Sequence, residues 1–416
     1  MEPRLYVMAR EFSTLALCLS CLTIYLSTIL LWGSEGPGIA TKPAFANFHV
    51  DNRSEFIGVT QAGHLPATQS DVNLVTTRVA KCDRPVTNFV FMKVHKTASG
   101  STFMVLARFG RNHNMTICFP ARREKARHIQ LSYPSGKLTK KDCRPALGRN
   151  YTLIIHHSVM NKPAMDRVMA PGTKYIGIFR EPLKHFRSIF FWKRKKFRHS
   201  KNPLGAFLDA SGNQKKRPYS KHHNFQAYTM GFPSNLLKSK NSSQIYDTIR
   251  TVAGWYSVVL ITEYWEESMV LLRRKFCWTM FDILHTTNKL HALHTSKEHA
   301  TLTDKQLQTH RRISNVDYMM YDYLNKTFWQ RVTEEGPAFW EEVTYYKTLN
   351  HQVNQHCKSA GGKRVFPAGK WSKEFAIDST FCKELKWREG QWANACWNVV
   401  ARRNEKTRMK KPNVIE

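Results

Sequence analysis

The chain has 416 residues, with 64 Lys and Arg against 31 Asp and Glu, so its formal net charge is +33 at pH 7. This length accommodates one large domain with further segments outside its core. The positive excess points to anionic ligands, anionic polymers or membrane surfaces, without choosing among them. No His and Cys grouping has the spacing of zinc ligands, so we expect no metal site.

The N-terminal region predicts a membrane anchor. Residues 12–32 carry no charge and are long enough to span the hydrocarbon core of a bilayer as a helix. Arg4 and Arg10 precede this segment and Glu35 follows it, so the positive-inside rule leaves a cytoplasmic tail, residues 1–11, and sends the remainder across the membrane. A cleaved signal peptide is the alternative, but the apolar run is longer than a usual signal-peptide core.

After the anchor, residues 33–84 have little apolar periodicity, which indicates a stem rather than a folded unit. Seven cysteines follow the anchor, so in an oxidising lumen one of them should stay unpaired or bond between chains. Possible N-glycosylation sequons are consistent with a secretory route; they occur at Asn52, Asn114, Asn150, Asn241 and Asn325.

Short apolar runs alternate with helical stretches through the central part of the chain. The expected strands are residues 88–94, 151–155, 174–179 and 257–261, and the last leads into a helix over 265–276. Buried strands that alternate with helices predict an α/β fold with a parallel sheet flanked by helices. We expect a catalytic domain over residues 85–350 and a basic C-terminal segment, residues 351–416, packed on it.

The first expected strand leads into a polar loop, Lys93 to Thr102, and then into a helix. Backbone N–H groups at the start of a helix can converge on phosphate or sulfate. The loop is not a Walker A motif, because Lys96 precedes the small residues instead of following a second glycine. A plain turn with a capped helix is the other interpretation.

The letters KVHKTAS at Lys93 to Ser99, continued by Phe109-Gly110 and His113-Asn114, resemble the 5′-phosphosulfate loop of the galactose 3-O-sulfotransferase family. The resemblance extends over about residues 89–340 and implies a P-loop-like sulfotransferase fold and the donor PAPS. It places the donor contacts on Lys93, Lys96, Thr97, Ser99, Gly100, Ser101 and Thr102. Gly100 departs from the family, which usually has Ser at this position.

A donor with phosphates at both ends of its ribose needs a second basic site. Arg180, at the end of the third expected strand, can hold phosphate oxygens with its planar guanidinium, and Pro182 suits the first turn of the next helix. Together with Ser188, the sequence Arg180-Glu181-Pro182 resembles the family's 3′-phosphate motif. By itself it also fits an ordinary helix start.

Sulfuryl transfer needs charge stabilisation on the leaving oxygen and a base for the attacking hydroxyl. Lys96 suits the first role and an imidazole suits the second. The candidates are His95 in the loop and His156-His157 after the second expected strand. The resemblance favours His95 first and His157 second, although such residues are often purely structural.

We therefore expect a single-pass type II Golgi enzyme that transfers a sulfuryl group from PAPS to a galactose hydroxyl of a glycolipid, such as galactosylceramide, or of a glycan. The resemblance implies the 3-OH, but residues 224–232 match the family only in part, which leaves the acceptor open. Another sugar or a glycosaminoglycan is an alternative acceptor. From a different class, the chain could be a membrane-tethered lectin that binds polyanions; a nucleic-acid partner is disfavoured by the lumenal topology.

Overall fold

The computed structural model describes residues 84–121, 131, 135–193, 200, 202–211, 218–286, 301–359 and 362–409, which all lie in the second of two compact units, Leu74–Glu416. Within these residues, no helix is both long and apolar enough to cross a membrane. The predicted tail, anchor and most of the stem, residues 1–83, lie outside the described part of the chain.

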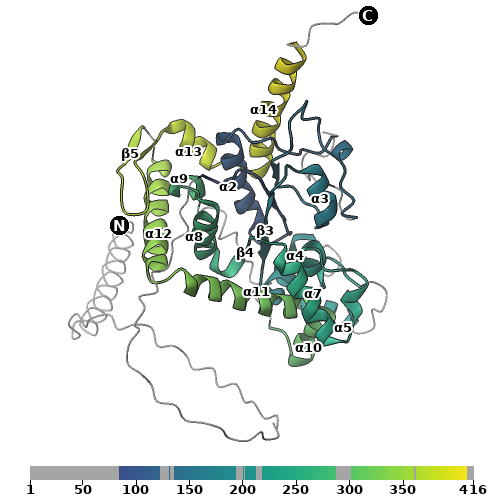
Figure 1. Cartoon of the computed structure of the whole chain (residues 1–416). Helices are drawn as coiled ribbons and strands as arrows, with labels where there is room; N and C mark the ends of the chain where they lie inside the picture. The colour runs from purple at the N-terminus through teal and green to yellow at the C-terminus, as the bar shows by residue number, and fades with distance from the viewer. Residues whose placement is uncertain are drawn as a thin grey trace, which may run out of the picture. The chain divides into compact units, whose positions relative to one another are not determined.

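Four parallel strands form the central sheet in the order β2-β1-β3-β4 (Figure 1). Their bounds are β1 Phe89–Phe91, β2 Leu153–Ile154, β3 Lys174–Phe179 and β4 Val258–Ile261. Phe89 pairs with both Leu153 and Lys174, and Phe179 pairs with Ile261. The strands are short continuous apolar runs because helices and loops bury both faces of a parallel sheet. The predicted α/β fold with a parallel sheet is confirmed.

Helices connect and surround the strands (Figure 1). The first half contains α2 Ser99–Asn112, η2 Lys140–Asp142, α3 Lys162–Val168, α4 Pro182–Lys193, α5 Pro203–Ser211, α6 Phe225–Thr229, η3 Leu236–Lys238 and α7 Ser242–Gly254. The second half contains η4 Thr262–Tyr264, α8 Trp265–Phe276, α9 Met280–Ile283, α10 Asp304–Ile313, α11 Asn315–Glu334 and α12 Ala338–Lys358. The expected strand over 174–179 and helix over 265–276 have these bounds in the structure.

Two hydrophobic clusters hold these elements together. The larger surrounds the sheet and includes strand residues such as Val90, Ile176 and Leu260, all inaccessible to solvent. The smaller joins α4, α5 and the start of α10 through residues that include Phe186 and Phe207. The second cluster lies beside the carboxyl end of β3, since α4 follows that strand directly.

The C-terminal segment is folded and contacts the sheet region. It contains β5 Arg364–Phe366, β6 Phe375–Ile377, α13 Ser379–Leu385 and α14 Glu389–Met409, and α14 packs against α2. The boundary expected between residues 350 and 351 lies inside α12. The break in sequence character at that point therefore does not coincide with the end of a helix.

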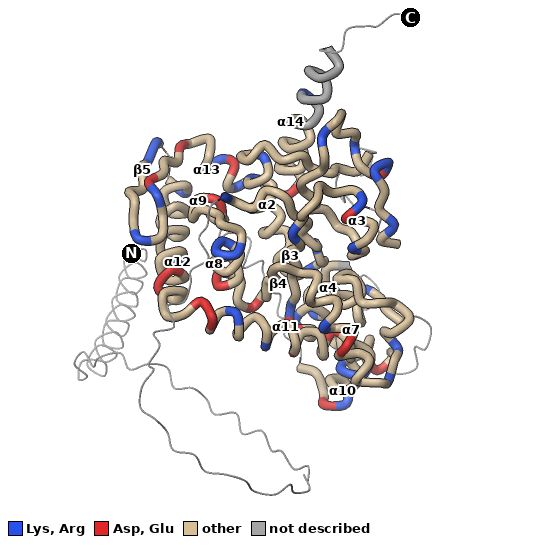
Figure 2. Tube along the Cα trace, in the orientation of Figure 1, with Lys and Arg blue, Asp and Glu red and all other residues tan. Residues whose placement is uncertain are grey.

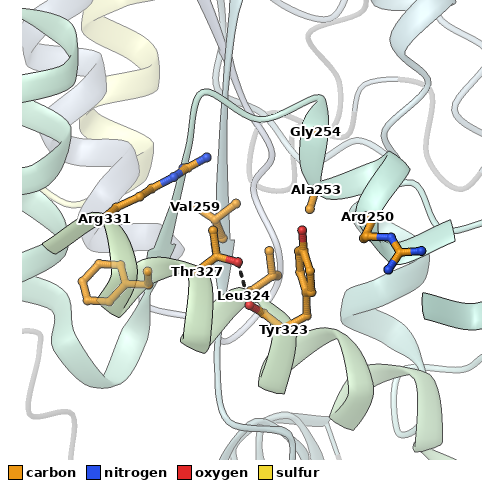
Figure 3. Close-up of a pocket in the computed structure, with 9 residues that line it drawn as sticks. Arg250, Ala253, Gly254, Val259, Tyr323, Leu324, Thr327 and Arg331 are labelled. Atoms are coloured by element: carbon orange, nitrogen blue, oxygen red, sulfur yellow. Dashed lines mark hydrogen bonds between the residues drawn. The ribbon is translucent and has the colours of Figure 1, made fainter. Parts of the chain in front are cut away.

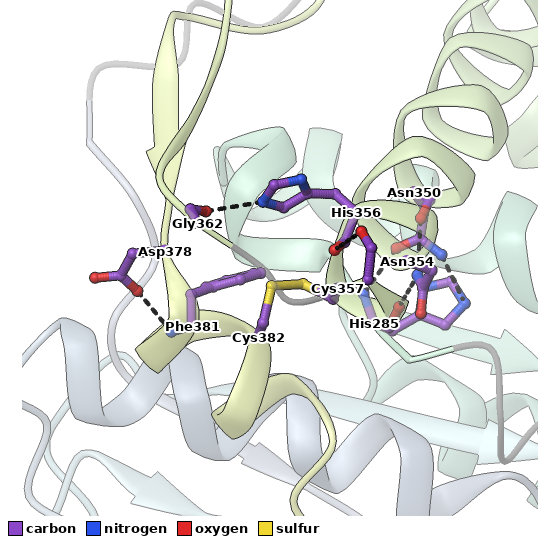
Figure 4. Close-up of a disulfide and its surroundings, with 10 residues drawn as sticks. His285, Asn350, Asn354, His356, Cys357, Gly362, Asp378, Phe381 and Cys382 are labelled. Carbon is purple, nitrogen blue, oxygen red and sulfur yellow. Dashed lines mark hydrogen bonds between the residues drawn. A yellow bond between two sulfur atoms is a disulfide. The ribbon is translucent and has the colours of Figure 1, made fainter.

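A disulfide between Cys357 and Cys382 joins α12 to α13 (Figure 4). Close to it, the amide of Asn354 on α12 donates to the carbonyl of His285 at 2.8 Å. These links attach the C-terminal segment to the helices that cover the sheet. The other cysteines comprise a Cys118–Cys143 disulfide, a disulfide-bonded Cys277 and, among the described residues, one buried free thiol at Cys396.

Basic residues are spread over the fold. Figure 2 shows Lys and Arg on α3, α8, α10 and β5, far apart along the chain. The charge of +33 is thus distributed across many elements, so charge alone does not locate a binding site.

Candidate active site

The carboxyl ends of the four parallel strands bring the predicted site residues to one edge of the sheet. β1 leads into the loop at Lys93, β2 into His156-His157, β3 into Arg180 and β4 into Glu263. The β1 strand lies between β2 and β3, and the chain leaves β1 toward one neighbour and returns to the other. Ligands of open α/β sheets bind at such a switch point because the loops diverge there.

The loop after β1 turns sharply into α2. Lys96 and Ala98 have left-handed backbone angles, with φ of 65° and 56°. For residues other than glycine this conformation costs about 1 kcal/mol or more, and such strain is common at functional sites. Ala98 is the N-cap of α2 and provides no side-chain cap, and the first turn carries no acidic residue. The amino end of α2 therefore has the electrostatics of an anion site.

Hydroxyl groups of the loop hold its shape. Thr97 donates to the carbonyl of Val94 at 3.0 Å, and Ser99 donates to the same oxygen. Thr102 donates to the Ala98 carbonyl at 3.3 Å and accepts a hydrogen bond from the Trp265 indole. These three hydroxyls, which the sequence suggested as donor contacts, are thus engaged within the protein; Ser101 is buried and Gly100 half-buried beside them.

Lys93 is a buried cation whose partner comes from the C-terminal segment. Its ammonium pairs with Glu389 at the start of α14 and lies 4.7 Å from the Phe103 ring centroid. The Lys93 side chain is 2% exposed, and this burial lowers its pKa while Glu389 acts in the opposite direction. A Cβ on Gly100 would lie 3.6 Å from the other Glu389 oxygen, so a side chain fits at this position.

The two imidazoles predicted as bases lie against each other. The rings of His95 and His157 stack with centroids 3.6 Å apart. His157 Nδ1 is 2.7 Å from the Lys93 carbonyl oxygen, which can only accept, so Nδ1 carries the proton and Nε2 is the proton-accepting nitrogen. Burial, followed by the charge of Lys93, lowers the pKa of His157 well below its usual value, so the ring is neutral at neutral pH.

His156 has a structural environment. It is buried with Phe103 and Phe119 at ring-centroid distances of 5.8 and 5.0 Å. Burial lowers its pKa to about 3, so it stays neutral in the core. The structure therefore separates the two adjacent histidines into one core residue and one residue beside Lys93 and His95.

Arg180 connects the end of β3 to the loop. Its guanidinium donates to the Lys96 carbonyl at 3.0 Å, and its own carbonyl accepts from the Gln226 amide at 2.9 Å. Glu263 lies 3.9 Å from Arg180 and accepts from the Glu181 backbone N–H at 3.1 Å. The predicted Ser188 is half-buried on α4, the helix that begins immediately after this contact.

Several residues of this site belong to no recognisable sequence motif. His185 on α4 donates from Nε2 to the His95 carbonyl at 2.9 Å. Trp192, 41% exposed at the end of α4, lies 5.4 Å from the His95 ring and 5.9 Å from the Lys96 ammonium. His185 and Trp192 are seven residues apart on α4, a spacing that places them on one face of the helix, and this spacing is the only local signal.

The short helix α6 is held against the site by α11. Asn224, with φ of 47°, accepts from the backbone N–H groups of Val316 and Asp317, and the Asp317 carboxylate accepts from the Ala227 N–H at 2.8 Å. This reciprocal arrangement places Phe225 of α6 6.0 Å from the His95 ring. Burial raises the pKa of Asp317 to about 7, although three backbone N–H groups oppose the shift.

A cavity lies near the opposite edge of the sheet. It has a volume of about 110 Å³ and lies between α7, the amino end of β4 and α11. In Figure 3, Arg250 and Arg331 flank it on either side of Tyr323. Arg250 pairs with Asp247, and Arg331 donates to the Ser257 carbonyl at 3.2 Å, so both cations serve local contacts. We do not place the donor here.

Among the described residues, no group of three or more His, Cys, Asp or Glu is arranged to hold a metal ion.

Comparison with known proteins identifies the family of this chain. The family model described as Galactose-3-O-sulfotransferase matches residues 39–369. Galactose-3-O-sulfotransferase 3 of Mus musculus is 33% identical over 257 residues, 60% of this chain and 58% of the relative. Galactosylceramide sulfotransferase of Bos taurus is 28% identical over 293 residues, 67% of this chain and 66% of the relative. The matched region thus spans less than two thirds of the length of these relatives, but the family model covers most of the chain.

The parallel sheet, the loop before α2 and Arg180 at the end of β3 all fall within the matched residues, and the chain belongs to the galactose-3-O-sulfotransferase family.

Proposed function

We propose that this chain transfers a sulfuryl group from PAPS to a galactose hydroxyl of a glycolipid or glycan. The observation that carries the proposal is the convergence of Lys96, Arg180, His95 and His157 beside the uncapped amino end of α2. Family membership implies that PAPS is the donor. The names of the relatives support the 3-OH of galactose as the acceptor position.

The residues present fit a bisphosphorylated donor. The 5′ end suits the amino end of α2, where the backbone N–H groups of Ser99, Gly100 and Ser101 precede the first intrahelical hydrogen bond, Thr102 N–H to Ala98. Lys96 adds positive charge on this loop, whereas the charge of buried Lys93 is paired with Glu389. Because three loop hydroxyls are engaged internally, we expect backbone N–H groups to supply most of the direct contacts.

At the other end of the donor, Arg180 and Ser188 are the proposed 3′-phosphate contacts. Arg180 is 16% exposed, so its guanidinium reaches the surface while its backbone is fixed by Gln226. A guanidinium held by its neighbours loses little conformational freedom when it binds phosphate.

The catalytic chemistry follows from the side chains of the site. PAPS supplies the sulfuryl group; Lys96 stabilises negative charge on the leaving oxygen. His95 and His157 are the candidate bases for the acceptor hydroxyl. The tautomer of His157 favours this residue as the base, because its Nε2 carries the lone pair that can accept the proton. Because the two rings stack, a proton taken up by one ring lowers the pKa of the other.

We further propose that the protein is a type II Golgi membrane protein anchored by residues 12–32. The uncharged run and its flanking charges support this topology. Three of the sequon asparagines, Asn114, Asn150 and Asn241, are exposed on the folded unit, which supports glycosylation in the lumen. Protease protection of a C-terminal tag in intact vesicles tests the proposal, and a tag that is digested without detergent would contradict it.

The activity is tested with the full-length protein in detergent, labelled PAPS and a panel of β-galactosides, other sugars and glycosaminoglycans. We expect transfer to β-galactosides, and Lys96→Ala should lower kcat/KM by about 100- to 1,000-fold, the usual effect of losing one charge-stabilising group. Lys373→Ala, which removes an exposed lysine near β6, is the matched control. Transfer only to another class of sugar would refute the galactose assignment, and donor-independent glycan binding without transfer would indicate a lectin.

A further inference from the structure

Gln226 is a buried glutamine on α6 that bonds the backbone of Arg180 with both halves of its amide. Its Oε1 accepts from the Arg180 N–H at 2.9 Å, and its Nε2 donates to the Arg180 carbonyl at 2.9 Å. Because the backbone N–H only donates and the carbonyl only accepts, these partners fix the orientation of the amide. Gln226 thus bonds Arg180 in the way that an opposite residue of an antiparallel strand would.

Arg180 needs this partner because it lies just beyond the paired part of the sheet. The pairing of β3 with β4 ends at Phe179 and Ile261, and the chain after Ile261 turns into η4. Backbone polar groups that are withdrawn from water require a hydrogen-bond partner, and Gln226 provides it from a different segment. The position of Arg180 therefore depends on where α6 lies as well as on β3.

The position of α6 is in turn determined by α11. The carboxylate of Asp317 accepts from the Ala227 N–H at 2.8 Å, and the side-chain oxygen of Asn224 accepts from the Val316 N–H at 3.1 Å. Asn224 and Asp317 are both buried. A helix of five residues has little stability of its own, so these contacts decide where Gln226 lies.

The guanidinium of Arg180 reaches the loop that carries the proposed catalytic lysine. It donates to the Lys96 carbonyl at 3.0 Å, and Lys96 has a left-handed backbone with φ of 65°, which is unfavourable for a lysine. The same guanidinium is the proposed contact of the donor's 3′-phosphate. One arginine therefore connects the 3′ end of the donor with the residue that acts at its 5′ end.

We propose that Gln226 is a positioning residue that couples the two ends of the donor site. By holding Arg180, it allows binding of the 3′-phosphate to stabilise the Lys96 backbone in its unfavourable conformation. The proposal rests on the proposed sulfotransferase function. Binding energy from a remote group that is used to orient the reacting centre raises kcat, so a donor without the 3′-phosphate should lose kcat as well as affinity.

The kinetic test compares two donors that differ only in the 3′-phosphate, PAPS and adenosine 5′-phosphosulfate, with the full-length protein and a β-galactoside. We expect kcat of the wild type to be at least about tenfold higher with PAPS. Gln226→Met nearly keeps the side-chain volume but removes both hydrogen bonds, and it should bring the ratio of the two kcat values close to one.

Gln306→Met is the matched control. Gln306 is a buried glutamine on α10 whose amide also accepts from a backbone N–H, that of Thr303 at 3.1 Å, and donates to Asp209 at 3.0 Å. Its replacement removes the same kind of contacts away from Arg180, and should retain the wild-type ratio. Gln226→Glu keeps the acceptor for the Arg180 N–H and loses the donor, so it should also lower the ratio, and the test does not depend on one variant.

Binding provides a second readout that does not require turnover. Calorimetry with the donor product PAP and with AMP, which lacks the 3′-phosphate, measures the contribution of that phosphate to affinity. Gln226→Met should weaken PAP binding by at least about tenfold and leave AMP binding within about twofold. In an Arg180→Ala background, Gln226→Met should change neither the PAP to AMP ratio nor the kcat ratio further, because it acts through Arg180.

Three results overturn the proposal. If the wild type has the same kcat with both donors and only KM differs, the 3′-phosphate contributes affinity alone, and the sulfotransferase function stands. If Gln226→Met lowers kcat by one factor with both donors and weakens PAP and AMP equally, Gln226 has only a structural role. If the wild type transfers sulfate to no galactoside from either donor, the proposed function fails and this proposal fails with it.

Discussion

Acid should unfold this protein steeply, because several imidazoles are buried in a neutral state. Burial lowers the pKa of His156, His185, His285 and His310 to about 3, and it lowers that of His157 well below its usual value. In the unfolded chain these groups titrate near pH 6.5. Between about pH 6.5 and pH 3 the unfolded state therefore binds more protons than the folded state, and stability falls as pH falls.

A few carboxyl groups act in the opposite direction. Burial raises the pKa of Asp317 to about 7 and raises those of Glu263 and Asp322, so below pH 7 they bind protons more readily in the folded state. Five imidazoles against these carboxyls leave a net uptake of roughly three protons on unfolding near pH 5.5. The free energy of unfolding should then fall by about 4 kcal/mol per pH unit. A domain with about 5–15 kcal/mol of stability cannot tolerate more than a few units of acidification.

Urea denaturation at a series of pH values, followed by tryptophan fluorescence with the disulfides intact, measures this slope. His310→Gln should reduce the slope by about 1.4 kcal/mol per pH unit, one proton, even though it also removes a hydrogen bond with Tyr318. His351→Gln, an exposed residue on α12, is the control and should leave the slope as it is. A slope of one proton or less, or greater stability at pH 5 than at pH 7, would refute the reasoning.

Three further predictions concern individual contacts. Glu389→Gln removes the charge that pairs with buried Lys93. Because Glu389 is 45% exposed, we expect the free energy of unfolding, measured by chemical denaturation, to fall by only about 1 kcal/mol. A loss below about 0.3 kcal/mol would show that the pair does not contribute to stability. Replacing Cys357 and Cys382 by Ser opens a loop of 25 residues, which should cost about 3.5 kcal/mol in a denaturation experiment; an unchanged midpoint would contradict the chain-entropy argument. His157→Gln should lower kcat about 100-fold while PAP binding stays within twofold; unaltered kcat would assign the base to His95.

Local sequence signals were sufficient for the elements that carry the proposed donor site. The strand β1, the loop from Lys93 and the start of α2 are contiguous, so apolar burial and small polar residues predict them together. Likewise, an apolar run followed by Arg180 and Pro182 predicts a buried strand and a helix start, and β3 and α4 have that form. The parallel sheet follows from the alternation of strands and helices.

Only the tertiary structure decided which distant residues complete the site. Glu389 pairs with Lys93 across 296 residues, although no motif marks it. The stacking of His95 on His157 depends on the register of β1 with β2, and the positions of Phe225 and Gln226 depend on packing of α6 against α11. Local patterns encode hydrophobic period and turn chemistry, whereas these contacts arise from how whole elements pack, which residues near in sequence do not specify.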